Sequence, residues 1–341
     1  NIMKYLLALL LILFYCGCSV NSPTPAPKPN DQWREVKVLK GHNRCVNCIN
    51  FSHSGKYLAS SCYSLKLWDV ATGKEIRTIT EHQGYIPIVI FSPDDKYIVS
   101  GSSDKTIRFW DVNTGEEIRL LGDRNDDKIW SLAFSPDGQF LAAATDNKSI
   151  IIWDMATNKE FNVLLGHTSE VYSVAFAPTG GSPVGATGGS PAGTNGPMLA
   201  SASIDNTVKI WDIYKSAPTY TLLGHTKEVS FVTFSPDGKF LASGGYDKLI
   251  KIWDPATGLE VKTLTGHTDK LCGIAYTPDG KYLATSGWDK MIKIWDTTTW
   301  QEIQTIRGHT EKACFIVFSP DGQLLASGSR DTLIKFWARG K

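Results

Sequence analysis

Histidine, serine and aspartate are the residue types of nucleophilic and acid–base catalysis, and this chain contains them in repeated sets. Of its seven histidines, one (His53) lies in a turn where proline is usual, and six occupy the same corner of a repeated unit: His42, His82, His167, His225, His267 and His309. Because the same residue types recur from unit to unit, we interpret them as structural. We find no Ser-His-Asp set, phosphate-binding loop or carboxylate pair outside the repeated positions, so the sequence predicts a protein that is not an enzyme.

Cysteine could supply metal or redox chemistry. Five of the seven cysteines lie in the repeated body: Cys45, Cys48, Cys62, Cys272 and Cys314. Cys45 and Cys48 have the spacing of half a zinc site, but no second pair or free histidine completes four ligands, so we expect no metal and no other cofactor. We hypothesise a disulfide between Cys62 and either Cys45 or Cys48, which an oxidising compartment would permit. The alternative is that these cysteines are buried apolar thiols.

The elements that carry these residues are copies of one stretch, LASGGYDKLIKIWDP at Leu241 to Pro255. Six copies end in Trp-Asp, with tryptophans at Trp68, Trp110, Trp153, Trp211, Trp253 and Trp295. A seventh ends at Trp337, followed by Ala338. The steps between successive tryptophans are 42, 43, 58, 42, 42 and 42 residues. A fixed period of this length predicts a propeller in which each repeat forms one four-stranded blade.

One unit can be followed residue by residue. Val229 to Phe234 alternates as a strand, SPDG makes a turn, and KFLASGG and LIKIWD follow as two further strands. Proline and aspartate favour the turn, and Gly238 can adopt positive φ. The ATG turn leads into a fourth strand, VKTLTGH, which also begins the next unit. This pattern predicts an antiparallel meander without helices.

With these motifs the sequence resembles the WD-repeat β-propeller family over residues 34–341. The resemblance implies an all-β, seven-bladed propeller in which a His, a Ser or Thr, an Asp and the Trp form a hydrogen-bonded tetrad inside a blade. Carried over to this chain, the tetrads are His82, Ser100, Asp104, Trp110; His167, Ser201, Asp205, Trp211; His225, Ser243, Asp247, Trp253; His267, Thr285, Asp289, Trp295; and His309, Ser327, Asp331, Trp337.

Two units depart from this pattern. The first, LASSCYSLKLW, is two residues shorter and has no aspartate in its turn. In the third, Asp123, Ala143 and Asn147 replace the histidine, serine and aspartate. We expect these blades to be the least rigid, or to be held by other contacts. We also expect the ring to close through residues 34–40, which have the pattern of a fourth strand and should pair with the last blade, removing an open edge.

The family resemblance also implies that partners dock on the top face, the face that carries the corner histidines and the turns before the third strands. The residues before the turn aspartates there are Ser103, Ile204, Tyr246, Trp288 and Arg330, and Tyr85, Trp130 and Tyr172 lie near the starts of first strands. Aromatic residues and arginine dominate protein-binding hot spots, so we predict a partner site at Tyr85, Trp130, Tyr172, Ile204, Tyr246, Trp288 and Arg330. For Trp130 and Tyr172, packing between blades is an equal alternative.

The first residues differ from the rest. Residues 1–18 have a lysine, a short apolar run and Cys-Gly-Cys, which is typical of a signal peptide and too short to span a bilayer. The ending resembles the lipobox of bacterial lipoproteins with Cys18 as the acylated residue, although Tyr15 and Cys16 depart from it. A plainly cleaved signal and an uncleaved anchor are the alternatives. Residues 19–33 are predicted to be a proline-rich tether, and residues 178–197 a Gly/Pro-rich insertion in the fourth blade.

Charge excludes one class of partner. Thirty-five basic and 34 acidic residues give a net charge of +1, without the basic surface expected for nucleic-acid binding. The sequence therefore predicts a monomeric, non-enzymatic scaffold for a protein or peptide partner, held at a membrane by a lipid anchor in a bacterial periplasm or at the cell surface, or else secreted. The alternatives are a permanent structural subunit of an envelope assembly and, less favoured, an enzyme with its site over the central channel.

Overall fold

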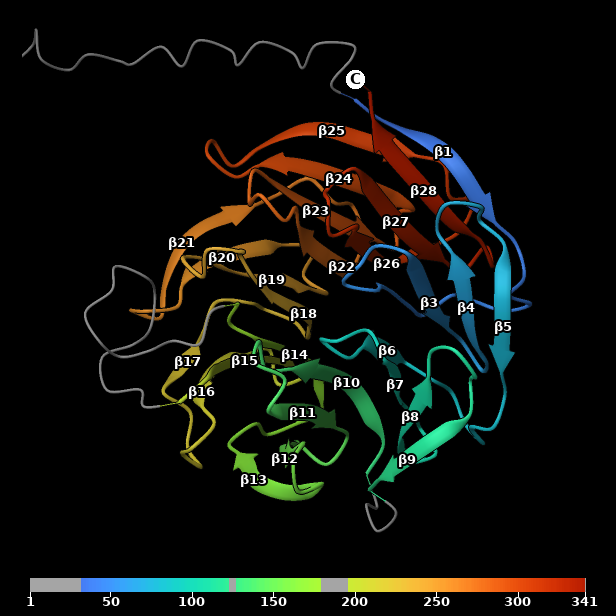
Figure 1. Ribbon diagram of the computed structural model, residues 1–341. Helices are drawn as coiled ribbons and strands as arrows, with labels where there is room; N and C mark the ends of the chain where they lie inside the picture. The colour runs from blue at the N-terminus through green and yellow to red at the C-terminus, as the bar shows by residue number, and fades with distance from the viewer. Residues whose placement is uncertain (1–31, 123–126, 179–195, 341) are drawn as a thin grey trace, which may run out of the picture.

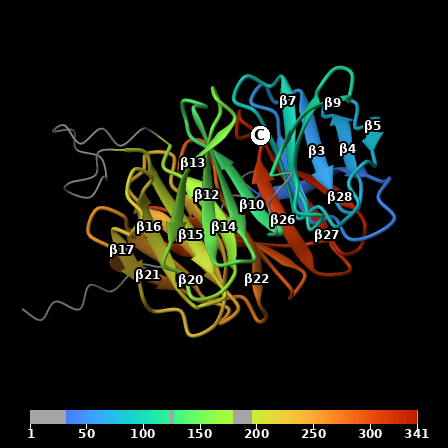
Figure 2. The same ribbon diagram turned by 90° about the horizontal axis from the view of Figure 1, so that it is seen from below.

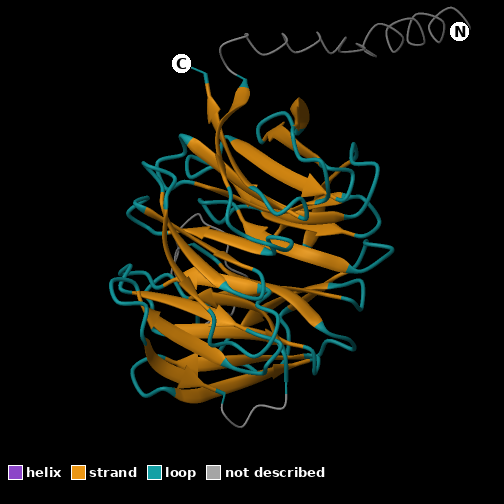
Figure 3. Cartoon of the chain, turned by 90° about the vertical axis from the view of Figure 1, so that its right-hand side faces the viewer, coloured by secondary structure: helices purple, strands orange, loops and turns teal. Residues whose placement is uncertain are grey.

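Strands make up the regular structure of residues 32–122, 127–178 and 196–340, the part of the chain that the computed structural model describes, and no helix occurs in these ranges. The strands form seven four-stranded antiparallel sheets placed side by side around a central axis (Figure 1). Figure 3 shows the described residues as strands joined by short loops. The seven-bladed β-propeller expected from the repeat is thus confirmed.

Each blade runs from an inner strand at the axis to an outer strand at the circumference. The inner strands are β2 (Cys48–Phe51), β6 (Ile88–Phe91), β10 (Ile129–Phe134), β14 (Val171–Phe176), β18 (Val229–Phe234), β22 (Leu271–Tyr276) and β26 (Ala313–Phe318). The second strands are β3 (Tyr57–Ser61), β7 (Tyr97–Gly101), β11 (Phe140–Thr145), β15 (Met198–Ser203), β19 (Leu241–Gly245), β23 (Tyr282–Gly287) and β27 (Leu324–Ser329).

The third strands carry the Trp-Asp motifs. They are β4 (Leu65–Asp69), β8 (Ile107–Asp111), β12 (Ser149–Asp154), β16 (Val208–Asp212), β20 (Ile250–Asp254), β24 (Met291–Asp296) and β28 (Ile334–Arg339). The outer strands are β5 (Glu75–Ile79), β9 (Glu117–Leu121), β13 (Lys159–Leu165), β17 (Tyr220–Leu222), β21 (Leu259–Leu264), β25 (Gln301–Arg307) and β1 (Trp33–Leu39). Seen at right angles to Figure 1, the strands run between two loop-bearing faces (Figure 2). The predicted insertion at 178–197 falls largely on residues 179–195, outside the described residues.

The ring closes through its first strand. β1 pairs antiparallel with β28, from Trp33 opposite Arg339 to Leu39 opposite Ile334, and Figure 1 shows the blue first strand beside the dark red last one. Lys335 Nζ reaches Glu35 Oε2 at 2.6 Å across this pair. The strand begins at Trp33, one residue before the expected boundary at 34. The closure expected for residues 34–40 is therefore present, and β28 lies between β1 and β27 rather than at the edge of the last blade.

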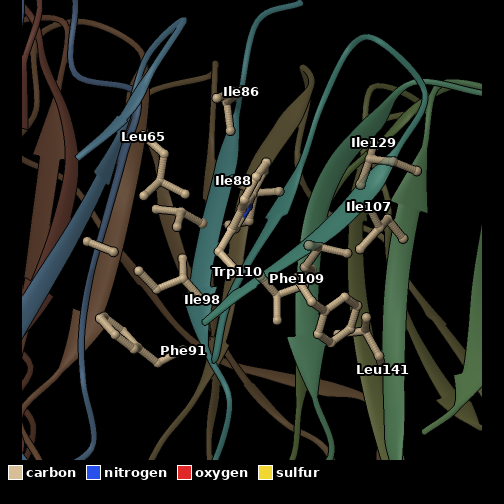
Figure 4. Close-up of a cluster of buried hydrophobic side chains, with 14 of the residues drawn as sticks. Leu65, Ile86, Ile88, Phe91, Ile98, Ile107, Phe109, Trp110, Ile129 and Leu141 are labelled. Carbon is tan, nitrogen blue, oxygen red and sulfur yellow. The ribbon is translucent and has the colours of Figure 1, made fainter. Parts of the chain in front are cut away.

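The core lies between adjacent blades rather than inside any one of them. Around the second blade, Figure 4 shows Trp110 and Phe109 of β8 among aliphatic side chains from neighbouring strands. Trp110 and Phe109 are each 1% exposed. Burying such side chains contributes about 1.5–3 kcal/mol each, so every blade depends on its two neighbours for stability. This interlocking makes the ring a rigid support for the loops on its two faces.

One turn shows how a departure in sequence is compensated between blades. Asp95 occupies the position where the equivalent turns have glycine and adopts a φ of 57°. Its carboxylate accepts hydrogen bonds of 2.7 Å from the backbone N–H groups of His53 and Ser54 in the first blade. Proline at position 53 would lack this N–H. The unusual histidine thus provides a backbone donor, while its side chain is 59% exposed.

Candidate functional site

The corner histidines are engaged within the blades. In the fifth blade, His225 Nδ1 lies 2.9 Å from an Asp247 oxygen and His225 Nε2 lies 2.8 Å from Ser243 Oγ. The same hydroxyl accepts the indole N–H of Trp253 at 2.8 Å. The Asp–His–Ser/Thr–Trp arrangement recurs in four other blades, with His82, Ser100, Asp104, Trp110; His167, Ser201, Asp205, Trp211; His267, Thr285, Asp289, Trp295; and His309, Ser327, Asp331, Trp337.

Electrostatics fix the protonation pattern of these tetrads. Burial alone raises the pKa of Asp104, but hydrogen bonds from Thr106 and His82 outweigh it and bring the pKa down to about 2. Burial lowers the pKa of His82 and His167 despite the neighbouring carboxylates. A neutral imidazole that donates from Nδ1 to the carboxylate must accept at Nε2 from the hydroxyl. Both ring nitrogens are therefore occupied, which leaves neither free for a substrate.

The two departing blades lack parts of this network. His42 Nε2 lies 2.6 Å from Ser60 Oγ, which accepts the N–H of Trp68 at 2.7 Å, but no aspartate occupies the turn. Burial, assisted by Lys66, lowers the pKa of His42 to about 4. In the third blade, Ala143 supplies no hydroxyl, and Trp153 Nε1 is buried without a hydrogen-bond partner. Asp123, at the histidine position, lies outside the described residues.

The five cysteines of the propeller are free thiols, so the hypothesised disulfide at Cys62 is not formed in this structure. Cys48 cannot easily form it, because its thiol is buried and lies 3.5 Å from the carbonyl oxygen of Val89. The neighbouring Cys62 thiol, with Arg330 and Arg44, lowers the pKa of Cys45, whose thiol donates a hydrogen bond to Asn47 Oδ1 at 3.2 Å. Within the described ranges, no three His, Cys, Asp or Glu side chains are grouped so as to hold a metal ion.

The central channel forms a concavity of about 1000 Å³, lined by the inner strands of the blades. Its mouth on the top face is surrounded by six of the seven predicted partner residues, which we call the collar: Tyr85, Trp130, Tyr172, Tyr246, Trp288 and Arg330. The seventh, Ile204, is half-buried on the rim and is not part of the channel lining. Below the mouth, the rings of Phe231 and Phe315 meet at 5.3 Å although their blades are not neighbours. Both rings line the channel, so they pack against each other across its interior.

Backbone geometry explains why these residues converge. The residue before each turn aspartate donates its N–H to the carbonyl of the residue three positions after the corner histidine: Tyr246 to Glu228, Trp288 to Lys270 and Arg330 to Lys312, at 2.8, 2.8 and 3.0 Å. A bulge at the start of the inner strand adds one more residue, which is Trp130, Tyr172, Ser230, Cys272 or Cys314 in five of the blades. Each such blade thus directs three side chains to the mouth.

Contacts within the collar cross blade boundaries. Trp130 and Tyr172 form an edge-to-face pair with ring centroids 5.5 Å apart, and Tyr246 and Trp288 lie 5.9 Å apart. Trp130 and Tyr172 therefore pack against each other between blades, and both also line the channel. The indole N–H of Trp130 is buried without a partner. An aromatic surface of this kind is suited to contact with a polypeptide.

Sequence reasoning missed three cations in this site. Lys270 Nζ lies 4.2 Å from the ring centre of Tyr246 and 4.8 Å from that of Trp288, and Lys312 Nζ lies 3.2 Å from the Trp288 ring centre. Arg44 stacks on Tyr63, which in turn contacts Tyr85. The available signal for the two lysines was their position three residues after the corner histidine. Their proximity to the collar follows only from the backbone pairing.

Comparison with known proteins agrees with this architecture. The family model described as WD domain, G-beta repeat, matches seven segments: residues 33–69, 73–111, 115–154, 158–212, 216–254, 258–296 and 300–338. The chain belongs to the WD-repeat family. Proteins of this family generally act as protein-interaction scaffolds. The first and third blades are matched as well, so loss of tetrad residues has not removed the repeat.

Among curated relatives, this WD-repeat chain is 32% identical to a nuclear distribution protein PAC1 of Coccidioides posadasii, over 62% of the chain and 38% of the relative. It is 29% identical to periodic tryptophan protein 2 of Arabidopsis thaliana, over 60% of the chain and 22% of the relative. A shorter match, 31% identical over 23% of the chain, is to 10% of the rat Elongator complex protein 2. The chain therefore matches less than half the length of these relatives.

Proposed function

We propose that this protein is a non-enzymatic interaction module that binds a protein or peptide segment across the collar on the top face. The observation that carries the proposal is the gathering of aromatic rings and an exposed arginine around the mouth of the channel. Tyrosine and tryptophan offer large contact areas with little entropy to lose, and arginine is enriched in protein-binding hot spots. Engagement of the corner imidazoles in tetrads favours binding over catalysis at this face. The rat relative, named for the Elongator complex, supports by analogy a role in assemblies.

Affinity capture from detergent-solubilised membranes tests the site. The triple variant Tyr246→Ala/Trp288→Ala/Arg330→Ala should lose the partner of the wild type while keeping its melting temperature. The matched control is Leu223→Ala/Leu259→Ala, which truncates side chains 72% and 67% exposed and remote from the collar. An unchanged set of captured proteins in the triple variant would refute the site. Retention of the partner in equimolar amount through high salt would instead favour the permanent structural subunit.

We also propose that the chain is a single propeller tethered to a membrane through Cys18. The apolar run and Cys-Gly-Cys ending support this proposal, and both lie outside the described residues. In the described part of the chain, no helix has the length and apolar character needed to cross a membrane. Metabolic labelling with a radioactive fatty acid should mark the wild type and not Cys18→Ser. Equal labelling of the two, or none in the wild type, would refute lipidation at this position.

A further inference from the structure

One sector of the top face concentrates positive charge. The basic sector consists of Lys270 and Trp288 in the sixth blade, Lys312 and Arg330 in the seventh, and Arg44 in the first. Three of its cations surround a single ring: Lys312 Nζ, Lys270 Nζ and the Arg330 guanidinium carbon lie 3.2, 4.8 and 5.8 Å from the centre of Trp288. Arg44 and Arg330 are both near enough to the thiol of Cys45 to lower its pKa. The sector thus continues without a break from the sixth blade to the first.

These cations are not neutralised by the protein. Within the described ranges, no ion pair is formed by Lys270, Lys312 or Arg330, because most of the neighbouring carboxylates are paired with other groups. Asp289 and Asp331 are held by the corner histidines, and Glu311 lies 3.7 Å from Lys290. Asp269 accepts the backbone N–H of Lys270. Ionisation of Cys45 would supply one negative charge against four positive ones.

The rest of the mouth has a different character. The positions equivalent to Lys270 and Lys312 are Glu228 and Glu170 in the fifth and fourth blades, and in the third blade Lys128 pairs with Asp146 at 3.5 Å. A long polyanion such as a nucleic acid would meet these carboxylates as it crossed the face. A short acidic segment can lie on the basic sector alone. Like charges gathered on one ring repel each other, and carboxylates placed among them would relieve that repulsion.

We propose that the basic sector binds an acidic polypeptide segment, whose Asp or Glu carboxylates lie among Lys270, Lys312 and Arg330 while an adjoining side chain packs on the collar aromatics. This inference rests on the proposed function and specifies the chemistry of the partner. The polarity of the mouth also orients the segment, because its acidic part must lie over the sixth and seventh blades. Basic residues of the same segment would be directed to Glu170 and Glu228. Recognition of this kind combines an apolar anchor with charge complementarity.

Selection from a phage-displayed library of random dodecapeptides on the full chain tests the inference without assuming a ligand. Enriched peptides should carry net negative charge and at least one large apolar residue. When a synthesised winner is titrated by calorimetry, Lys270→Ala/Lys312→Ala/Arg330→Ala should bind it at least about tenfold more weakly, and raising the salt concentration from 50 to about 300 mM should weaken wild-type binding. The matched control, Lys96→Ala/Lys239→Ala/Lys281→Ala, removes the same charge from exposed turns on the opposite face and should bind like the wild type.

Other results of the selection and the titration would refute the inference. Enriched neutral or basic peptides that lose binding to Trp288→Ala would refute the acidic partner and leave the collar as the proposed site. No enrichment, or binding unaffected by Trp288→Ala, would refute both. Tighter binding of a phosphoserine peptide or a single-stranded oligonucleotide than of the acidic peptide would also overturn the inference. If the triple variant melts early, Lys270→Gln and Lys312→Gln replace it, and each should weaken binding about threefold or more.

Discussion

Ser243→Ala removes the hydroxyl that joins the two halves of the fifth-blade tetrad. Ser243 is fully buried, and its Oγ lies 2.8 Å from both His225 Nε2 and Trp253 Nε1. In the variant, both nitrogens lose this partner while remaining buried. An unsatisfied buried polar group costs about 1–3 kcal/mol, so for these two groups we expect the free energy of unfolding to fall by about 2–6 kcal/mol. The lost volume is a single oxygen atom, so a cavity adds little.

Urea unfolding followed by tryptophan fluorescence measures this change. Ser216→Ala is the control, because Ser216 is an exposed loop serine and its replacement should alter stability by less than about 0.5 kcal/mol. The reciprocal change, Ala143→Ser, places a hydroxyl where Trp153 Nε1 has no partner and should raise stability by about 1 kcal/mol. Equal unfolding midpoints for Ser243→Ala and Ser216→Ala would show that the tetrad does not stabilise the blade.

Three further predictions concern other parts of the ring. Deletion of residues 30–41 removes β1 and exposes the contacts of Trp33 and Leu39, now 4% and 2% exposed, so it should cost at least about 4 kcal/mol, whereas deletion of 19–29 should leave the melting temperature unchanged. His42 has a folded-state pKa of about 4 against an ordinary 6.5, so the unfolded state takes up the proton first as the pH falls, and the free energy of unfolding should fall by about 3 kcal/mol between pH 6.5 and 4. Urea denaturation at a series of pH values should show a weaker dependence on pH for His42→Asn. The same dependence in wild type and variant would contradict the assignment. Iodoacetamide should modify Cys45 well before Cys48, because Cys45 is half-exposed and its neighbours lower its pKa, whereas burial raises the pKa of Cys48 to about 12. Mass spectrometry of tryptic peptides would show the order of labelling. Faster labelling of Cys48 would contradict the prediction.

The scaffold could be predicted from sequence because each blade is encoded locally. Alternation of apolar residues defines the strands, and the recurrence of Trp-Asp defines their number and order. Ring closure could be predicted because the last unit supplies three strands, through Trp337, and residues 34–40 have the pattern of the fourth. The strand start at Trp33 was missed because its neighbours are polar and exposed, while its own ring packs on Phe318 at 5.4 Å from a distant part of the chain.

The site was harder to predict because its contacts join blades. The partner of Asp95 is His53, which lies 42 residues away, and no local pattern connects the two. The approach of Lys270 to Tyr246 likewise depends on how neighbouring blades are rotated about the axis. The disulfide hypothesis joined Cys62 to Cys45 or Cys48, and the structure has all three as free thiols, with Cys62 near enough to Cys45 to lower its pKa. Sequence distance gives the register within a blade but not the geometry between blades.

Within each blade, different groups stabilise the fold and form the surface, which explains why the side chains around the mouth differ from blade to blade although the backbone repeats. Stability at the corner comes from the buried tetrad and from the backbone hydrogen bond between the residue before the aspartate and the residue three positions after the histidine. Neither needs a particular side chain at those two positions. The pairs can therefore be Ile204 with Glu170 in one blade and Trp288 with Lys270 in another without any change in backbone path. Side chains at these pairs are free to differ for recognition. A concentration of cations around one tryptophan contributes nothing that the fold requires, which is why we assign it to a partner.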